Sequence, residues 1–209
     1  MLDGKTFAGL KVLDMSQGVA TPHCGMMLAQ HGASVTKVEP FEGDWSRIIG
    51  KRYDDFTAAT VAFNRGKRGL ALDLKKPEGL EITKKLAAEA DVVLQSFRPG
   101  VIERLGLDYA TVAEFNPDVI YLSLSGFGSE GPYAKNPGTD SVMQAYTGFM
   151  SINRDANGMP HLTDIYVVDL ATSLYLFSTL VTALYQRRES GEGCHIETSL
   201  AEAMGAFHA

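Results

Sequence analysis

The sequence predicts an α/β protein with a Rossmann-like parallel sheet and helices on both faces. Apolar, strand-like runs alternate with helical stretches through residue 128, which is the order of a parallel sheet with right-handed crossovers. β-branched residues are frequent in the strand-like runs, as strands prefer. The chain of 209 residues is 45% hydrophobic, so it can bury a core large enough for such a sheet.

The first βαβ unit opens the chain. Residues 10–15 (LKVLDM) and 33–40 (ASVTKVEP) are rich in apolar and β-branched residues, which predicts two strands. A loop over 16–22 and a helix over 23–32 connect them, and Pro22 suits a first helical turn.

The same pattern repeats further along the chain. Residues 68–74 (RGLALDL) predict a strand, 75–79 a loop that opens a helix, 80–90 an amphipathic helix, and 91–97 (DVVLQSF) the next strand. These two units predict neighbouring parallel strands with helices packed on the sheet.

Short helices and a further strand follow. Residues 101–106 and 109–115 predict the helices, and 117–128 predicts an apolar strand that ends in glycines. A long loop then spans residues 126–140. Loops of that length in compact domains usually serve a site, so this one is a candidate active-site segment.

The second half of the chain is mainly helical. Residues 141–150 and 170–188 predict helices, and 195–200 predict another strand. Another helix begins inside residues 199–209 and nothing terminates it. We therefore expect the natural chain to continue beyond this sequence.

Charge and composition exclude several classes of protein. A formal net charge of -6 argues against nucleic-acid or membrane-surface binding, because both partners favour a positive field. The first ten residues, MLDGKTFAGL, lack a basic segment followed by an apolar one, so we expect a cytoplasmic protein. Cys24 and Cys194 are too few and too widely spaced for zinc. We expect two reduced, structural cysteines and no metal site.

Residues 165–185 are apolar over a length that could span a membrane. One carboxylate, Asp169, and five serine or threonine side chains lower the hydrophobicity of this segment. We therefore predict a buried helix.

A dinucleotide site is the first alternative that the βαβ pattern raises. Glu39 closes the second strand, where a carboxylate could hold a ribose. The stretch from residue 16 to residue 25 (SQGVATPHCG) contains Gly18 and Gly25 but no G-x-G-x-x-G pattern, so its backbone cannot approach a pyrophosphate in the usual way. A nicotinamide site is not favoured.

Basic residues gather in four short stretches of an otherwise acidic chain. Such residues are usually solvated surface charges. Two of them, Lys75 and Arg98, follow predicted strands directly, at the carboxyl edge where open α/β sheets bind ligands. Lysine and arginine there would suit a phosphorylated ligand. The four stretches contain Lys51 and Arg52; Arg65, Lys67 and Arg68; Lys75 and Lys76; Arg98 and Arg104.

Asp169 has two compatible interpretations. As a helix N-cap it would accept a backbone N–H from the first turn, a role that aspartate prefers. As a functional group, a carboxylate among apolar neighbours is partly desolvated, which raises its pKa and makes the anion more reactive toward a carbonyl.

Six stretches together resemble the family III CoA-transferases, which include formyl-CoA transferase, carnitine CoA-transferase and alpha-methylacyl-CoA racemase, with older names such as bile-acid-inducible protein F and carnitine dehydratase. The resemblance covers almost the whole chain. The stretches are GLKVLDMSQGVATPHCGMMLAQHGASVTKVEP, NRGKRGLALDLKKPEG, DVVLQSFRPGVIERLGLDY, NPDVIYLSLSGFGSEGPY, GTDSVMQAYTGFM and RRESGEGCHIETSLAEAM.

The resemblance implies that residues 1–209 form the N-terminal, Rossmann-like CoA-binding domain and the helices that follow it. The family's second domain and its returning C-terminal segment would be absent. It also implies an interlocked homodimer, acyl-CoA and a carboxylic acid as substrates, and no permanently bound cofactor.

The family's catalytic aspartate falls on Asp169. By resemblance this carboxylate attacks an acyl-CoA thioester, forms a mixed anhydride and frees the CoA thiolate, which is then passed to the acceptor acid. The family's CoA contacts fall on Val19, Ala20, Leu72, Asp73, Leu74, Lys75, Ser96, Phe97, Arg98 and Arg104.

Three positions depart from the family pattern. Ser96 stands where asparagine is common, and Pro40 stands where some members have arginine. Thr139 replaces the histidine with which the racemase branch moves an alpha proton, and His161 is the nearby imidazole that could replace it. We expect a CoA-transferase; the alternatives are a 2-methylacyl-CoA racemase or epimerase and a CoA-binding protein without turnover.

Overall fold

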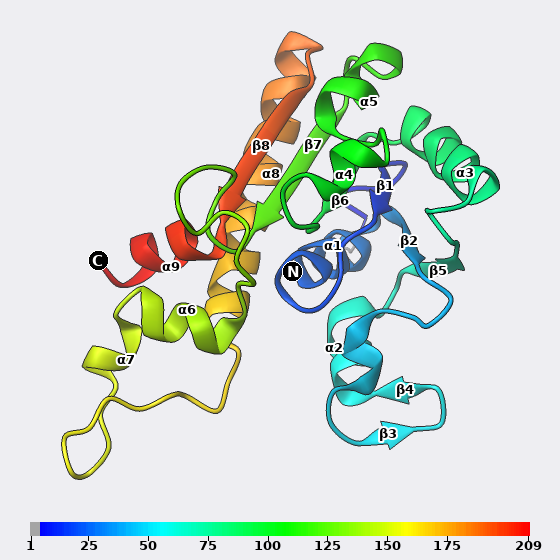
Figure 1. Ribbon diagram of the computed structural model, residues 1–209. Coiled ribbons are helices and arrows are strands. Elements are labelled where there is room, and N and C mark those ends of the chain that lie inside the picture. The colour runs from blue at the N-terminus through cyan, green and yellow to red at the C-terminus, as the bar shows by residue number, and fades with distance from the viewer. Residues whose placement is uncertain (1–4) are drawn as a thin grey trace.

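One six-stranded parallel sheet organises the protein, whose computed structural model describes residues 5–209 (Figure 1). The strands lie in the order β5-β2-β1-β6-β7-β8, and each pairs in parallel with its neighbours. The α/β prediction is therefore confirmed. The strands are β1 (Lys11–Asp14), β2 (Ser34–Glu39), β5 (Arg68–Ala71), β6 (Val92–Gln95), β7 (Ile120–Ser125) and β8 (Cys194–Ser199).

The strand order reverses between β1 and β6, which lie side by side in the centre of the sheet. The chain builds outward on one side from β1 to β5 and on the other from β6 to β8. A doubly wound sheet binds ligands outside the carboxyl ends of the strands at this reversal. The segments that leave β1 and β6 are therefore the first place to look for a site.

Helices cover both faces of the sheet, as predicted (Figure 1). Side chains alternate along each strand, so that in β6 Leu94 belongs to one core and Val93 to the other. The first core includes residues of α1 (Ala20–Gln30), α6 (Asp140–Tyr146), α8 (Val167–Ser190) and α9 (Leu200–His208). The second includes residues of α3 (Pro77–Ala88), α4 (Val101–Arg104) and α5 (Tyr109–Phe115).

Residues 41–64 form a small region to which the sequence analysis assigned no element. It contains η1 (Trp45–Ile48), β3 (Arg52–Tyr53), β4 (Phe56–Thr57) and α2 (Ala58–Asn64). The two strands are only two residues long, too short to produce an apolar alternation that a sequence reading could detect.

Several helix boundaries differ from the predictions. α1 begins at Ala20 rather than at residue 23, so Ala20 and Pro22 belong to the helix and not to the loop before it. α3 begins at Pro77 rather than at residue 80, because proline fits the first helical turn. Residues 141–150 were predicted as one helix but form α6 and α7 (Phe149–Ile152), which Gly148 separates with a φ of 85°. α8 begins at Val167 rather than at residue 170.

The predicted loop between β7 and α6 is present, and two glycines close its base. A Cβ on Gly126 would lie 2.7 Å from the Cα of Gly138, and one on Gly138 would lie 2.5 Å from the Cα of Gly126. Neither position can carry a side chain without moving the backbone, so the loop must leave and return at this point.

α8 is long and apolar enough to cross a membrane by length and composition alone, a test that core helices of soluble proteins also pass. In this structure 39% of its apolar window is buried, on the side that packs against α1 and the sheet (Figure 1). The prediction of a buried helix holds for that side. Leu174, Tyr175 and Tyr185 are exposed.

Candidate active site

Two adjacent clefts lie at the carboxyl edge of the sheet, where the strand order reverses. Their volumes are about 480 Å³ and about 420 Å³. Met15 and Gln17, which follow β1, and Phe97 and Val101, which follow β6, line both clefts. The two clefts therefore form one crevice at the switch point of the fold.

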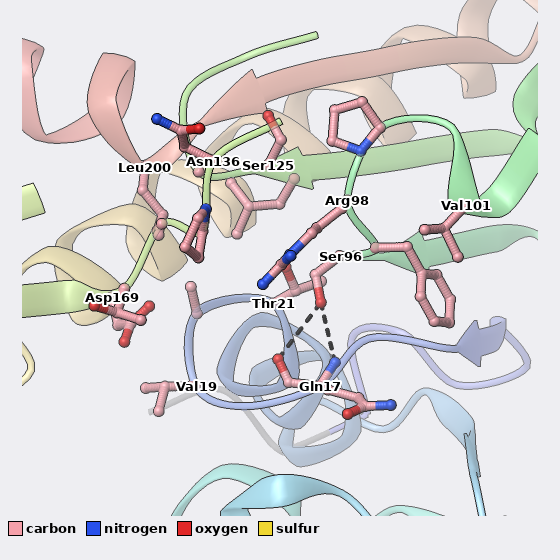
Figure 2. A pocket seen from close by; sticks show the side chains of 18 of the residues that line it. Gln17, Val19, Thr21, Ser96, Arg98, Val101, Ser125, Asn136, Asp169 and Leu200 are labelled. Atoms are coloured by element: carbon pink, nitrogen blue, oxygen red, sulfur yellow. Dashed lines mark hydrogen bonds between the residues drawn. The ribbon is translucent and has the colours of Figure 1, made fainter. Parts of the chain in front are cut away.

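Every site residue named by the resemblance lines this crevice. Those that share the first cleft are Val19, Ala20, Ser96, Phe97, Arg98 and Asp169 (Figure 2). Those that line the second are Leu72, Asp73, Leu74, Lys75, Phe97 and Arg104. Segments more than a hundred residues apart in sequence are thus brought together. Their binding roles stay predictions.

Three basic side chains in this crevice have no carboxylate partner. Lys75, Arg98 and Arg104 are exposed, and none of them makes an ion pair with any residue in 5–209. Exposed, uncompensated cations at a sheet edge attract phosphate or carboxylate groups. The crevice is therefore suited to an anionic ligand although the chain as a whole is acidic.

Asp169 is not the N-cap of its helix, which corrects one of the two interpretations. α8 begins at Val167 with Tyr166 at the cap position, so Asp169 is its third residue. The backbone N–H of Asp169 donates to Oδ2 of Asp140 at 3.0 Å. A carboxylate from α6 thus satisfies a free amide of the first turn, and the helix starts one turn earlier than its own sequence indicates.

The pKa of the Asp169 carboxyl is raised to about 7. Burial is the largest cause and the nearby negative charge of Asp140 the second, while the backbone amide of Ala20 at the start of α1 acts in the opposite direction. This supports the second interpretation of Asp169, a partly desolvated carboxylate. Near neutral pH it is present as both acid and anion.

Asp140 is a site residue that the sequence reasoning missed. It is 7% exposed, and its Oδ1 accepts from Nε2 of Gln144 at 2.6 Å while its Oδ2 holds α8. The available signal was an acidic residue directly after Thr139, at the end of the predicted loop and just before a predicted helix. Nothing in the sequence indicated that it would meet Asp169.

Ser96 uses its hydroxyl within the protein. The Ser96 Oγ accepts from the backbone N–H of Gln17 at 3.0 Å and donates to the carbonyl of Gln17 at 3.4 Å (Figure 2). The serine at this departure from the family pattern thus joins the segment after β6 to the turn after β1. It lines the first cleft while also fixing one of its walls.

The turn after β1 passes beneath an indole ring. Gly18 has a φ of 87°, and a Cβ there would lie 2.1 Å from the ring of Trp45, so this position requires glycine. The Gly18 N–H donates to Oδ1 of Asp44 at 3.0 Å. Trp45 and the turn together form part of the first cleft.

Behind this turn lies a group of charges that we call the closed cluster: Asp14, Lys37, Asp44 and Lys67. Their side chains are at most 2% exposed. Lys67 Nζ lies 2.7 Å from Asp14 Oδ2, and Lys37 Nζ lies 2.9 Å from Asp44 Oδ2. Each charge is therefore paired inside the protein, as buried charges must be.

The closed cluster also holds the backbone of the turn. Asp14 accepts from the N–H and hydroxyl of Ser16, and Lys37 donates to the Ser16 carbonyl at 2.6 Å. Burial opposes ionisation of Asp14, but Lys67 and Lys37 outweigh it and hold its pKa below the usual value. Burial lowers the pKa of Lys67 to about 8. The general expectation that Lys67 is a surface charge is wrong.

Glu39 has no free oxygen for a ribose. Arg47 donates to it from Nε at 2.7 Å and from Nη2 at 2.9 Å, and the Asp44 N–H donates at 2.8 Å. This pairing agrees with the view that the βαβ unit is not a nicotinamide site.

Thr139 lines the first cleft, whereas His161 is exposed in a distant loop and does not line it. The described lining contains no histidine. Among residues 5–209 no group of three His, Cys, Asp or Glu side chains could hold a metal ion, and Cys24 and Cys194 are both free.

A doubly wound sheet, with a sheltered carboxylate and unpaired cations at its switch point, defines an α/β protein whose crevice is suited to an anionic ligand. The chain matches CoA-transferase family III over residues 7–209 and belongs to that family. This confirms the resemblance on which the site residues were predicted.

Curated and solved relatives agree with this assignment. Succinate–glutarate CoA-transferase from Agrobacterium fabrum is 39% identical over 207 residues, which cover 95% of this chain and 52% of that protein. Human succinyl-CoA:glutarate CoA-transferase is 36% identical, over 97% of this chain and 47% of that protein. A CAIB/BAIF family crystal structure from Brucella suis superposes with a TM-score of 0.93 at 36% identity, covering 98% of this chain and 56% of its own. The chain spans about half the length of these relatives.

Proposed function

We propose that the whole protein transfers CoA from an acyl-CoA to a carboxylic acid, with Asp169 as the covalent nucleophile. The observation that carries this proposal is the state of Asp169: a partly buried carboxylate without a cationic partner among residues 5–209, in a crevice whose cations make no ion pair within those residues either. A carboxylate in that state is available to react rather than committed to an ion pair.

The shape of the crevice supports one orientation of the ligand. The second cleft carries Lys75 and Arg104 and would take the phosphate groups of CoA. The shared residues Gln17 and Phe97 would line the passage of the pantetheine arm. The thioester would then reach the first cleft, where Asp169 lies.

The proposed chemistry divides the transfer into acyl exchanges at one carboxylate. The Asp169 carboxylate attacks the thioester carbonyl, the carbon–sulfur bond breaks, and CoA leaves as a thiolate. The thiolate attacks the aspartyl carbonyl of the mixed anhydride, which gives an aspartyl-CoA thioester and releases the donor acid. The acceptor carboxylate then displaces CoA to form a new anhydride, and the thiolate takes the acceptor acyl group and restores Asp169.

The names of the relatives point to dicarboxylic acids as substrates. The names of two of them specify succinate and glutarate, and we propose acids of this class here. The racemase alternative is less well supported, because inversion needs a second acid or base and the described lining of the first cleft has none other than Asp169.

We further propose that the whole protein is a cytoplasmic homodimer. The exposed apolar residues Leu174, Tyr175 and Tyr185 on the outer side of α8 support an interface there, because they lie on a helix that is otherwise part of the core. Sedimentation of the full-length protein tests this; a monomer at micromolar concentration would contradict it.

The test of function uses full-length protein with a set of acyl-CoA donors and isotope-labelled dicarboxylates. Asp169→Asn keeps the shape of the side chain but not its nucleophile, so transfer should fall by about a thousandfold or more. Asp164→Asn, at a nearby exposed position, is the matched control and should transfer at the wild-type rate. Near wild-type transfer by Asp169→Asn would refute the nucleophile.

A further inference from the structure

A single hydrogen bond joins two helices next to Asp169. His23 Nδ1 on α1 and Ser173 Oγ on α8 are 2.7 Å apart, although 150 residues separate them in sequence. Within residues 5–209 this is the one hydrogen bond between side chains of α1 and α8. The two helices pack closely against each other, and the bond lies within their contact.

The spacing of these residues places the bond one helical turn from Asp169. His23 comes three residues after Ala20 in α1, and Ser173 comes four residues after Asp169 in α8. Residues three or four apart lie on the same face of a helix. The Ala20 amide that faces the Asp169 carboxylate and the His23–Ser173 bond are therefore successive contacts between the same two helix faces.

The hydroxyl of Ser173 donates to the carbonyl of Leu170 at 2.7 Å, so its oxygen is left to accept from His23. Burial lowers the pKa of His23, and the positive charges of Arg65 and Lys67 lower it further. The imidazole is thus neutral at pH 7 with its proton on Nδ1, where it can donate to Ser173.

We propose that the His23–Ser173 hydrogen bond is a positioning contact that keeps the Asp169 carboxylate against the amide end of α1. α1 has no side-chain cap and no acidic residue in its first turn. The carboxylate that meets its free amides therefore comes from α8. Amides and dipole at a helix start stabilise an anion, so the relative position of the two helices controls how easily Asp169 ionises.

Loss of this contact should make Asp169 harder to ionise. If α8 shifts away from α1, the amide of Ala20 no longer lowers the pKa of Asp169, while burial and Asp140 still raise it. Asp140 also holds the start of α8 through the N–H of Asp169. The experiment must therefore distinguish the effect of the His23–Ser173 bond from that of this second contact, which also positions the start of α8.

Four variants of the full-length protein separate these roles. Ser173→Ala and His23→Leu each remove one partner of the bond. His23→Asn keeps a donor at the place of Nδ1. Thr182→Ala is the matched control, since it removes a hydroxyl from the same helix that bonds only within α8, to the carbonyl of Ser178.

The first readout does not depend on activity. Infrared titration of protein labelled with ¹³C-aspartate, with the Asp169 band assigned by its loss in Asp169→Asn, gives the pKa directly. We expect a midpoint near the wild-type value of about 7 in Thr182→Ala and His23→Asn. Ser173→Ala and His23→Leu should titrate at higher pH. An unchanged midpoint in both variants would overturn the proposal, because the hydrogen bond from Asp169 N–H to Asp140 would then be enough to hold the Asp169 carboxylate in place.

The second readout rests on the proposed function. In Ser173→Ala the kcat for CoA transfer should fall on the order of tenfold at about pH 6, with the deficit shrinking toward about pH 9, where Asp169 is ionised in every variant. KM for acyl-CoA should change less than about twofold. A deficit that is the same at every pH would overturn the positioning role. A shifted midpoint in a protein without transfer activity would support the contact and refute only the proposed function.

Discussion

The closed cluster and the crevice lie at the same edge of one sheet and use the same kinds of charged residue, yet they treat charge in opposite ways. In the closed cluster each lysine meets a carboxylate at less than 3 Å, and the side chains are almost fully buried. In the crevice Lys75, Arg98 and Arg104 have no carboxylate partner among residues 5–209, and Asp169 has no cationic one.

The difference distinguishes two roles: the charges of the closed cluster stabilise the fold, whereas those of the crevice are available to bind a ligand. The closed cluster fixes the turn from Ser16 to Gly18 through its backbone groups, and this turn forms a wall of the crevice. The crevice leaves its cations exposed and unpaired, so that a bound anion can pair with them. We interpret the crevice as the binding site, because its charged side chains are unpaired while the turn that forms its wall is held by the paired charges of the closed cluster.

The largest effect that separates the two regions concerns a pair of lysines. Lys67→Met leaves Asp14 buried without its partner and should lower the free energy of unfolding by about 3–5 kcal/mol. Lys75→Met removes an exposed, unpaired charge and should change it by less than about 0.5 kcal/mol. Urea unfolding of both variants measures this. If both variants lost the same free energy of unfolding, the two regions would not differ in how they use charge.

The next effect concerns Asp169 and pH. Its folded-state pKa of about 7 lies above the ordinary value of 3.8, so the folded protein holds this proton more tightly than the unfolded chain does. The stability gained is fully present below about pH 4 and is lost as pH rises through about 7. Asp169→Asn should therefore stabilise the protein by roughly 1–3 kcal/mol at about pH 8 and very little at about pH 4.

Thermal or urea unfolding of wild type and Asp169→Asn at both pH values checks this sign. The exposed Asp164→Asn serves as control and should show no such pH dependence. If Asp169→Asn were destabilising at the higher pH, the carboxylate would be a structural partner, like those of the closed cluster.

The smallest effect concerns the ligand. Arg104→Ala should weaken CoA binding on the order of tenfold, because arginine forms charge-assisted bonds with phosphate, and rising salt should weaken wild-type binding as well. Binding of the pantetheine fragment, which lacks the nucleotide phosphates, should change much less. Calorimetric titration of both ligands decides this; equal losses would place Arg104 away from the phosphates.

The fold was predictable because its signals are local. Alternation of apolar strands with helices along residues 10–128 is visible in the sequence and gives the doubly wound sheet. The crevice followed too, since Lys75 and Arg98 come three or four residues after the ends of β5 and β6, whose carboxyl ends must share an edge.

Features that depend on distant partners were not predictable. The stretch NRGKR looks like a solvated basic patch, but Lys67 is buried because Asp14, 53 residues earlier, lies beside it. Asp169 looks like a helix cap because aspartate prefers that position, yet Asp140, 29 residues earlier, caps the helix in its place. The periodicity of a sequence does not reveal such pairings, because each of these residues taken alone fits a common role at the protein surface.

The central claim is that Asp169 forms a covalent bond to the acyl groups it exchanges, and oxygen labelling tests it most directly. Full-length protein is incubated with an acyl-CoA and an acceptor acid labelled with ¹⁸O in its carboxyl group, and the peptide containing Asp169 is analysed by mass spectrometry. Attack of the acceptor on the aspartyl thioester leaves an acceptor oxygen on Asp169 when the anhydride is resolved. The account predicts ¹⁸O in the Asp169 carboxyl. Formation of the acceptor's CoA thioester over many turnovers with no label in Asp169 would contradict it.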